Sequence, residues 1–247
     1  DHKFSEWLTL GGTMSYTNTK STLVQNGSNL AGIMLPLLRM PVDYDIRDYI
    51  DKETGEQKSY IPYYDNPLFS VKKNPYTDET DRFLGNFYFD IKFNEMFTLS
   101  SKTGVDTYNT EGKQIYARYS NGNDYGDGSG QVNRQKIAYR NLYSDLLLKF
   151  NKSFGDSKEF TISGLLGANY NYTQMKRTFE RGRIMTIPDF YGFSGFKELY
   201  VSDRDWHTES KALFLDVTFD FRSIVFLTLT GREEWSSTFG KDSDGFF

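Results

Sequence analysis

Hydrophobic and polar residues alternate with a period of two along seven segments of this chain, and this pattern constrains its fold most strongly. In residues 83–93, for example, Phe87 and Ile91 fall on one parity and Asp90 on the other. The alternation predicts β-strands in residues 8–17, 83–93, 97–106, 142–150, 160–173, 213–221 and 225–232. The charged residues of these segments all fall on the polar parity: Asp90, Lys92, Lys102, Asp106, Asp145, Lys149, Asp216, Asp220 and Arg232. One face of the predicted sheet therefore carries no charge.

Two kinds of sheet would show this alternation. A soluble antiparallel sheet can bury one face, and a transmembrane β-barrel turns one face to lipid and the other to its lumen. An Arg or Lys that faces the bilayer midplane costs about 2–4 kcal/mol, so a lipid-facing surface requires this segregation of charge.

The lengths of the connections favour the barrel. Short turns alternate with long loops, which we predict at about residues 18–81, 108–136, 174–205 and 233–245. Outer-membrane barrels have short periplasmic turns and long extracellular loops, whereas structureless loops beyond roughly 15 residues are uncommon in compact soluble domains. We therefore predict an all-β fold, a partial transmembrane antiparallel β-barrel, over residues 1–247, with the long loops outside the cell.

The composition agrees with this prediction. A mean hydropathy of -0.60 does not exclude a barrel, because only alternate residues of its strands face lipid. Aromatic residues make up 17% of the chain, which favours strands. The sequence has no Cys, so disulfides and thiolate metal sites are excluded. A net charge of -4 provides no basic surface for nucleic acid, and we expect no nucleic-acid partner.

The number of predicted strands indicates a part of a larger barrel. A single-chain bacterial barrel has an even number of strands and at least about eight, because an open edge cannot remain in lipid. The alternation predicts seven strands, and an eighth begins near Phe246 after a loop rich in Gly and Asp. We therefore expect both ends of the chain to be cuts within a longer protein.

A motif near the C-terminal end resembles a known family. Residues 227–238, LTLTGREEWSST, resemble the strand-to-loop motif of the SusC/RagA family of TonB-dependent transporters from Bacteroidetes, with Glu234 where that family usually has Asp. Residues 38–41, 66–68, 74–76 and 82–86 resemble the long loop that leads into a strand in the same family, with Thr77 in place of its usual Trp.

This resemblance implies what the remainder of the protein contains, where it lies and what it transports. It implies a barrel of about 22 strands in the bacterial outer membrane, filled by an N-terminal plug domain that is absent from this chain. It implies a SusD-like surface lipoprotein as partner, energy from TonB through the missing N-terminal part, and a glycan or peptide as substrate.

Few residues suggest chemistry. Only His2 and His207 could serve as catalytic or metal-binding histidines, and we expect His207 to be a solvated residue at the barrel rim. Residues 121–129 are rich in oxygen ligands that suit calcium, but they lack the Glu that completes an EF-hand loop, so we expect a solvated loop. We predict no catalytic residue, no metal site and no cofactor.

Apolar and aromatic residues of the long loops are the candidates for contact with a substrate or a partner. Residues 29–38 form an apolar patch that either packs within the loops or contacts a lipoprotein. The loop aromatics can stack on sugars or grip peptide side chains, and they can equally hold the loops together. The predicted contact residues are Leu35, Leu37, Tyr60, Tyr63, Tyr64, Phe190, Tyr191, Phe193 and Trp206.

Three functions fit the pattern. The first is active import by a TonB-dependent barrel, the second is passive diffusion through a porin, and the third is a secreted all-β binding or adhesion module. The third would be soluble without detergent, which an exposed face of Phe, Leu and Val does not allow. None of the three is an enzyme.

Overall fold

The chain forms a single antiparallel β-sheet. The computed structural model describes residues 2–25, 29–155, 159–240 and 245–246. Within these residues nine strands pair in the order of the sequence. The strands are β1 (His2–Lys3), β2 (Leu8–Leu23), β3 (Tyr76–Lys92), β4 (Phe97–Tyr116), β5 (Gln131–Phe154), β6 (Phe160–Met185), β7 (Phe196–Phe221), β8 (Val225–Ser236) and β9 (Gly245–Phe246). The predicted all-β class is confirmed: six predicted segments lie within strands β2 and β4 to β8, and the segment 83–93 extends one residue beyond β3.

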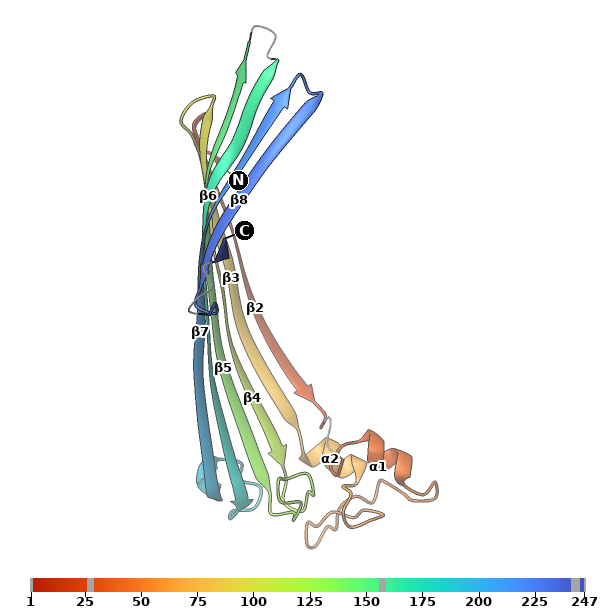
Figure 1. Ribbon diagram of the computed structural model, residues 1–247. Helices are drawn as coiled ribbons and strands as arrows, with labels where there is room; N and C mark the ends of the chain where they lie inside the picture. Colours follow the sequence, from red (N-terminus) through yellow and green to blue (C-terminus); the bar gives the residue numbers. More distant parts are fainter. Residues whose placement is uncertain (1, 26–28, 156–158, 241–244, 247) are drawn as a thin grey trace.

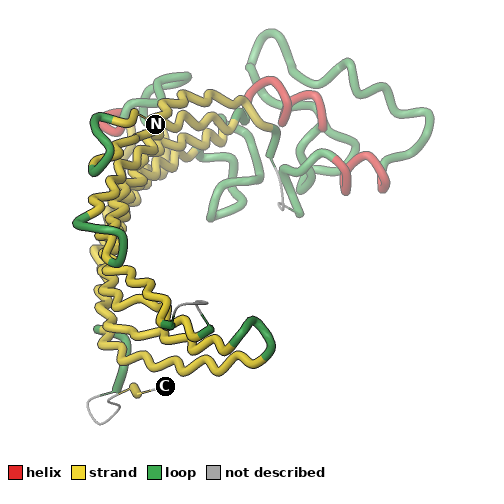
Figure 2. Tube along the Cα trace, turned by 90° about the horizontal axis from the view of Figure 1, so that it is seen from above, coloured by secondary structure: helices red, strands yellow, loops and turns green. Residues whose placement is uncertain are grey.

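The sheet is tall, curved and one layer thick. Figure 1 shows the β3–β4, β5–β6 and β7–β8 connections at one end, called here the short-turn end, and the β2–β3, β4–β5 and β6–β7 connections at the opposite, long-loop end. Helices α1 (Met34–Arg39) and α2 (Pro67–Lys73) lie in the β2–β3 connection at the long-loop end, and η1 (Phe193–Gly195) lies between β6 and β7. Figure 2 shows that the strands follow an open arc. This arc is a segment of a barrel wall.

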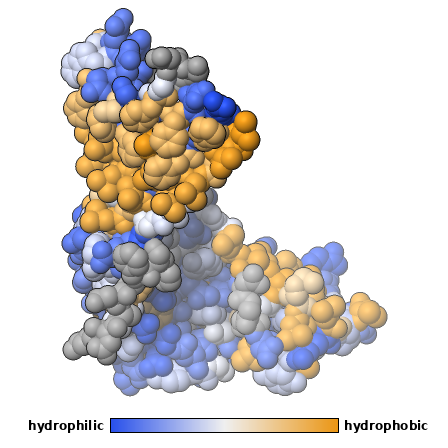
Figure 3. Space-filling view, turned by 45° about the horizontal axis from the view of Figure 1, so that its top comes forward, coloured by the Kyte–Doolittle hydropathy of each residue, from blue (hydrophilic) through white to orange (hydrophobic). Residues whose placement is uncertain are grey.

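The strand register places residues of the same predicted parity on the same face across the whole sheet. Leu166 on β6 pairs with Leu148 on β5 and Leu215 on β7, whereas its neighbour Leu165 pairs with Lys149 and Asp216. We call the side of Leu166 the apolar face and the side of Leu165 the polar face. All nine charged residues of the predicted segments lie on the polar face, as predicted. Figure 3 shows the apolar side chains as a band over the part of the sheet nearest the short turns.

The apolar face is not covered by a second layer of the described chain. Met14 is 82% exposed, Leu166 52% and Leu229 56%. The buried cluster of Val132, Met185 and Phe196 instead lies at the long-loop end. None of the described helices is long and apolar enough to cross a membrane.

The predicted loop boundaries were wrong, because the strands extend well beyond the alternating segments. The connections at the long-loop end span residues 24–75, 117–130 and 186–195, and β8 continues to Ser236 inside the predicted loop 233–245. In these extensions both faces are polar, so the period of two disappears from the sequence although the hydrogen-bonded ladder continues.

Ion pairs between directly opposite residues accompany these extensions. They join Lys20 to Glu79 at 2.9 Å, Lys136 to Glu111 at 3.8 Å and Lys176 to Asp205 at 3.2 Å. These three pairs lie on the side that is apolar nearer the short turns. Because these pairs are solvent-exposed, each contributes at most about 1 kcal/mol.

Aromatic rings on the polar face lie over glycines of the adjacent strand. Gly11 pairs with Tyr88, Gly104 with Tyr143 and Gly167 with Phe214. A Cβ atom at Gly167 would lie 2.2 Å from the Phe214 ring, and the other two glycines are as closely covered. Such ring-over-glycine pairs fill the gap left by the missing side chain and help to fix the register.

Candidate functional site

A buried carboxylate joins the two longest connections at the long-loop end. Asp65 is fully buried between residues 24–75 and 117–130. It accepts hydrogen bonds from the Ser120 hydroxyl at 2.5 Å, the Asn121 backbone N–H at 2.7 Å and the Gln57 amide at 2.7 Å. Burial raises the pKa of Asp65, and these hydrogen bonds oppose that rise.

Two asparagines extend this network. Asn66 caps α2 by accepting a hydrogen bond from the Leu68 N–H at 2.9 Å, just before a proline that begins the helix. Asn74 at the other end of α2 donates to Ser120 at 2.8 Å and accepts from the Ala117 N–H at 2.8 Å. The two connections therefore form one hydrogen-bonded loop body beside the ends of β3 and β4.

The predicted tyrosines of the first loop pack mainly against one another. Tyr64 is buried, lies 4.8 Å from Tyr63 and 6.1 Å from Tyr60 between ring centroids, and its hydroxyl accepts a hydrogen bond from Arg39. Only Tyr63 of the three is more than half exposed. The cluster anchors α1 to the loop body and leaves one ring available to an external ligand.

Helix α1 presents the apolar patch expected from the sequence. Leu35 is half-buried, whereas Met34, Leu37 and Leu38 are exposed, with Leu38 at 76%. Side chains this apolar and this exposed on a loop suit contact with another protein.

The predicted aromatics of residues 186–195 support the end of the sheet. Tyr191 and Phe193 pack against the buried cluster of Val132, Met185 and Phe196, while Phe190 is 43% exposed. Burial, with a smaller contribution from Asp189, raises the pKa of Tyr191 to about 12.

Trp206 lies apart from these loops, on the polar face of β7. It pairs with Met175 of β6 and its side chain is 43% exposed. His207 faces the other way and its ring stacks on Tyr172, with 6.2 Å between centroids. The structure thus brings together the aromatics of the first loop, but it places Trp206 within the sheet.

The oxygen-rich loop of residues 121–129 uses its side chains within the protein. Asn123 donates to Asp127 at 2.7 Å, and Asp124 forms an ion pair with Arg181 of β6 at 2.5 Å. Among the described residues, no group of three or more His, Cys, Asp or Glu side chains could hold a metal ion.

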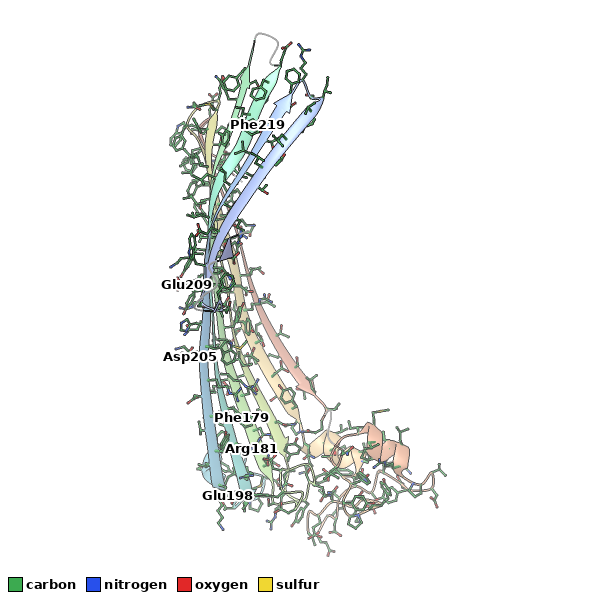
Figure 4. The ribbon with its side chains drawn as sticks, in the orientation of Figure 1. Phe179, Arg181, Glu198, Asp205, Glu209 and Phe219 are labelled. Atoms are coloured by element: carbon green, nitrogen blue, oxygen red, sulfur yellow. The ribbon has the colours of Figure 1, made fainter. Side chains whose placement is uncertain are left out.

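A row of arginines that was not predicted from the sequence lies on the polar face of β6. Arg177, Arg181 and Arg183 share this face with Phe179, at spacings that a strand converts into one surface. Arg183 pairs with Glu198 of β7 at 3.3 Å. Figure 4 shows Phe179 and Arg181 of this row toward the long-loop end, far from Phe219 at the short-turn end. Because residues 177, 181 and 183 are separated by even numbers of positions, their shared face could have been predicted from the sequence.

An open antiparallel sheet with an uncharged apolar band on one face and polar residues on the other defines a class of structure: a segment of β-barrel wall. No protein-family model matches the sequence, and no curated protein matches it.

Solved structures of the RagAB peptide transporter share the fold. One is 15% identical with a TM-score of 0.72, and it aligns with 98% of this chain. The RagAB peptide importer in its "closed-closed" state is 17% identical with a TM-score of 0.73, and in its "open-open" state 18% identical with a TM-score of 0.71. The chain spans 27% of the length of each of these solved chains. At these identities the likeness establishes the barrel fold.

Proposed function

We propose that this chain is part of the wall of a TonB-dependent outer-membrane transporter that imports peptides or glycans with a SusD-like surface lipoprotein. The observation that carries the proposal is the exposed, uncharged band of the apolar face nearest the short turns, opposite a polar face. An apolar surface of this extent marks contact with lipid or protein, and its form as a band across a barrel wall suits the hydrocarbon core of a bilayer.

Strand length supports a transporter with walls that rise above the membrane. Strand β6 has 26 residues, which at roughly 3.3 Å per residue corresponds to about 85 Å. A tilted strand crosses the hydrocarbon core with about 9–11 residues. More than half of β6 therefore lies outside the core, and the charged extensions at the long-loop end would surround a wide entrance.

Active import is favoured over a passive porin by two independent observations. The fold is shared with the RagAB peptide transporter, and residues 227–238 resemble the SusC/RagA motif. The exposed residues of α1 form the contact surface for the lipoprotein, and Tyr63 and Phe190 provide contacts for substrate or partner.

TonB dependence tests the proposal. The protein as its own gene encodes it should support uptake of an oligopeptide or oligosaccharide in cells with TonB, and uptake should fall to background in cells without it. Uptake that persists without TonB would identify a passive porin. A protein that leaves the cells in soluble form would identify a secreted module.

The lipoprotein partner has its own test. Replacing Met34, Leu37 and Leu38 together by Ser should abolish co-purification of the lipoprotein while the barrel still folds, because these side chains are exposed. Replacing the equally exposed Glu53 and Glu56 by Ser is the matched control and should leave co-purification unchanged. If the lipoprotein still co-purifies with the α1 variant, the apolar patch is not the contact surface for the lipoprotein.

A further inference from the structure

Two arginines face each other across adjacent strands of the polar face. Arg177 on β6 pairs directly with Arg204 on β7. Like charges directly opposite each other in a sheet are destabilising, so this arrangement costs stability unless an anion lies nearby.

These two arginines lack the carboxylates that neutralise their neighbours. Arg181 pairs with Asp124, and Arg183 with Glu198. Among the described residues, neither Arg177 nor Arg204 forms an ion pair. The positive charges of Arg177 and Arg204 are therefore not offset by an ion pair among the described residues.

Arg177 also has an unsatisfied donor. Its Nη2 atom donates to the Gln135 side chain at 2.5 Å, but its Nε–H is buried and finds no acceptor among the described residues. A buried donor without a partner costs roughly 1–3 kcal/mol, so the like-charge pairing with Arg204 is not the only unfavourable feature at this position.

A hollow of about 260 Å³ lies over the pair. It is lined by Arg177, Phe179, Arg181, Tyr200, Ser202 and Arg204. The Phe179 and Tyr200 rings meet edge to face at 6.4 Å between centroids, and the Arg181 guanidinium lies 5.0 Å from the centre of the Phe179 ring. The hollow thus combines unpaired guanidinium groups with aromatic surface, and Trp206 follows Arg204 on the same face of β7.

We propose that this hollow binds a carboxylate group of the transported substrate, held by Arg177 and Arg204 against the Phe179 and Tyr200 rings. Guanidinium groups bind carboxylates through paired, charge-assisted hydrogen bonds, and the rings exclude water from one side. The inference rests on the proposed function, because it places the hollow on the lumen side of a transporter wall. It adds that the substrate is acidic.

Binding to the purified, detergent-solubilised protein tests the inference. The probes are triglutamate and trigalacturonate, with triglutamine and a neutral galactose trisaccharide as uncharged counterparts, and titration calorimetry measures each Kd. At least one acidic probe should bind about tenfold or more tightly than its neutral counterpart, and the preference should weaken between 50 and 500 mM salt. Preference for triglutamate identifies an acidic peptide, and preference for trigalacturonate identifies an acidic glycan.

Variants locate the site. Arg177→Gln and Arg204→Gln should each weaken binding of the acidic probe about tenfold. Arg177→Lys should lose part of the affinity, because it keeps the charge and loses the paired geometry. Arg140→Gln is the matched control, since Arg140 is exposed on the opposite side of the sheet. Removing one of two like charges should not impair folding, which a heat-modifiability gel would verify.

The outcomes separate this inference from the proposed function. Equal affinity for acidic and neutral probes, or an equal loss in Arg140→Gln, would overturn the carboxylate site even where uptake depends on TonB. Specific binding of an acidic probe that requires Arg177 and Arg204 would support the site even where uptake proves independent of TonB.

Discussion

Adjacent leucines on β6 provide a direct test of which face meets lipid. Leu166 lies on the apolar face, midway between Phe160 and Tyr172, and pairs with Leu148 and Leu215. Leu165 lies on the polar face, opposite Lys149 and Asp216. The substitution of either leucine by Arg changes the same side chain in the same way, and only the face differs.

The two substitutions should differ strongly in how much they destabilise the barrel. At the centre of the apolar band, Leu166→Arg should destabilise the barrel by about 2–4 kcal/mol, which is the cost of an Arg on the lipid face at the bilayer midplane. This cost corresponds to a factor of about 30–1000 in the folding equilibrium. Leu165→Arg should cost less than about 1 kcal/mol, because its guanidinium would face Asp216 and Lys149, whose effects oppose each other.

The assay is urea unfolding of the protein, as its own gene encodes it, in phospholipid vesicles, followed by the tryptophan fluorescence and by heat-modifiable migration on gels. Assembly in cells should show the same order, with Leu166→Arg reduced and Leu165→Arg close to the parent. Equal stability of the two variants, or greater damage from Leu165→Arg, would refute the assignment of the apolar face to lipid.

Three further predictions concern the loop body and the sheet. Asp65→Ala should expose residues 24–75 and 117–130 to limited proteolysis while the barrel still folds, because it leaves the donors of Ser120, Asn121 and Gln57 without an acceptor at about 1–3 kcal/mol for each buried group. Burial raises the pKa of Asp65 above its ordinary value of roughly 3.9. The contribution of Asp65 to loop stability should therefore be fully present below that value and should be lost as pH rises through the higher folded pKa. Amide hydrogen exchange would measure this pH dependence, and a pH dependence that persists in Asp65→Asn would contradict its assignment to Asp65. Gly167→Ala should destabilise the barrel by about 1 kcal/mol in urea unfolding, since the added Cβ meets the Phe214 ring at 2.2 Å, whereas Gly231→Ala meets no atom within 4 Å and should be neutral.

The sequence predicts the strands well where the two faces differ in polarity. In the apolar band a one-residue shift in register would turn Asp90 or Asp216 onto the apolar face, so the alternation is strict and all seven segments could be recognised. Beyond the band both faces are polar, and residues such as Lys20 and Lys176 lie on the side that is apolar elsewhere. Nothing in the local pattern then distinguishes a strand from a loop.

The candidate site was less predictable, because it depends on contacts between distant segments. The sequence identifies Tyr60 and Tyr64 as aromatic loop residues, but only the folded loop shows that they pack on each other. The pairing of Arg177 with Arg204 requires the β6–β7 register, and that register extends through residues expected to be a loop. The sequence also left open whether the apolar residues of α1 pack within the loops or contact a partner, and only the folded loop shows that Met34, Leu37 and Leu38 are exposed.

Single-cysteine labelling on intact cells tests the central claim most directly, namely that the sheet crosses the outer membrane with its short turns inside. The chain has no Cys, so one introduced thiol is the only one in this segment that a membrane-impermeant maleimide can label. Lys52 at the long-loop end and Glu95 in the β3–β4 turn are both exposed. Lys52→Cys should label on intact cells, and Glu95→Cys should label only after the outer membrane is permeabilised. Labelling of Glu95→Cys on intact cells, with Lys52→Cys protected, would show the opposite orientation, and labelling of both would show that the sheet does not cross the membrane.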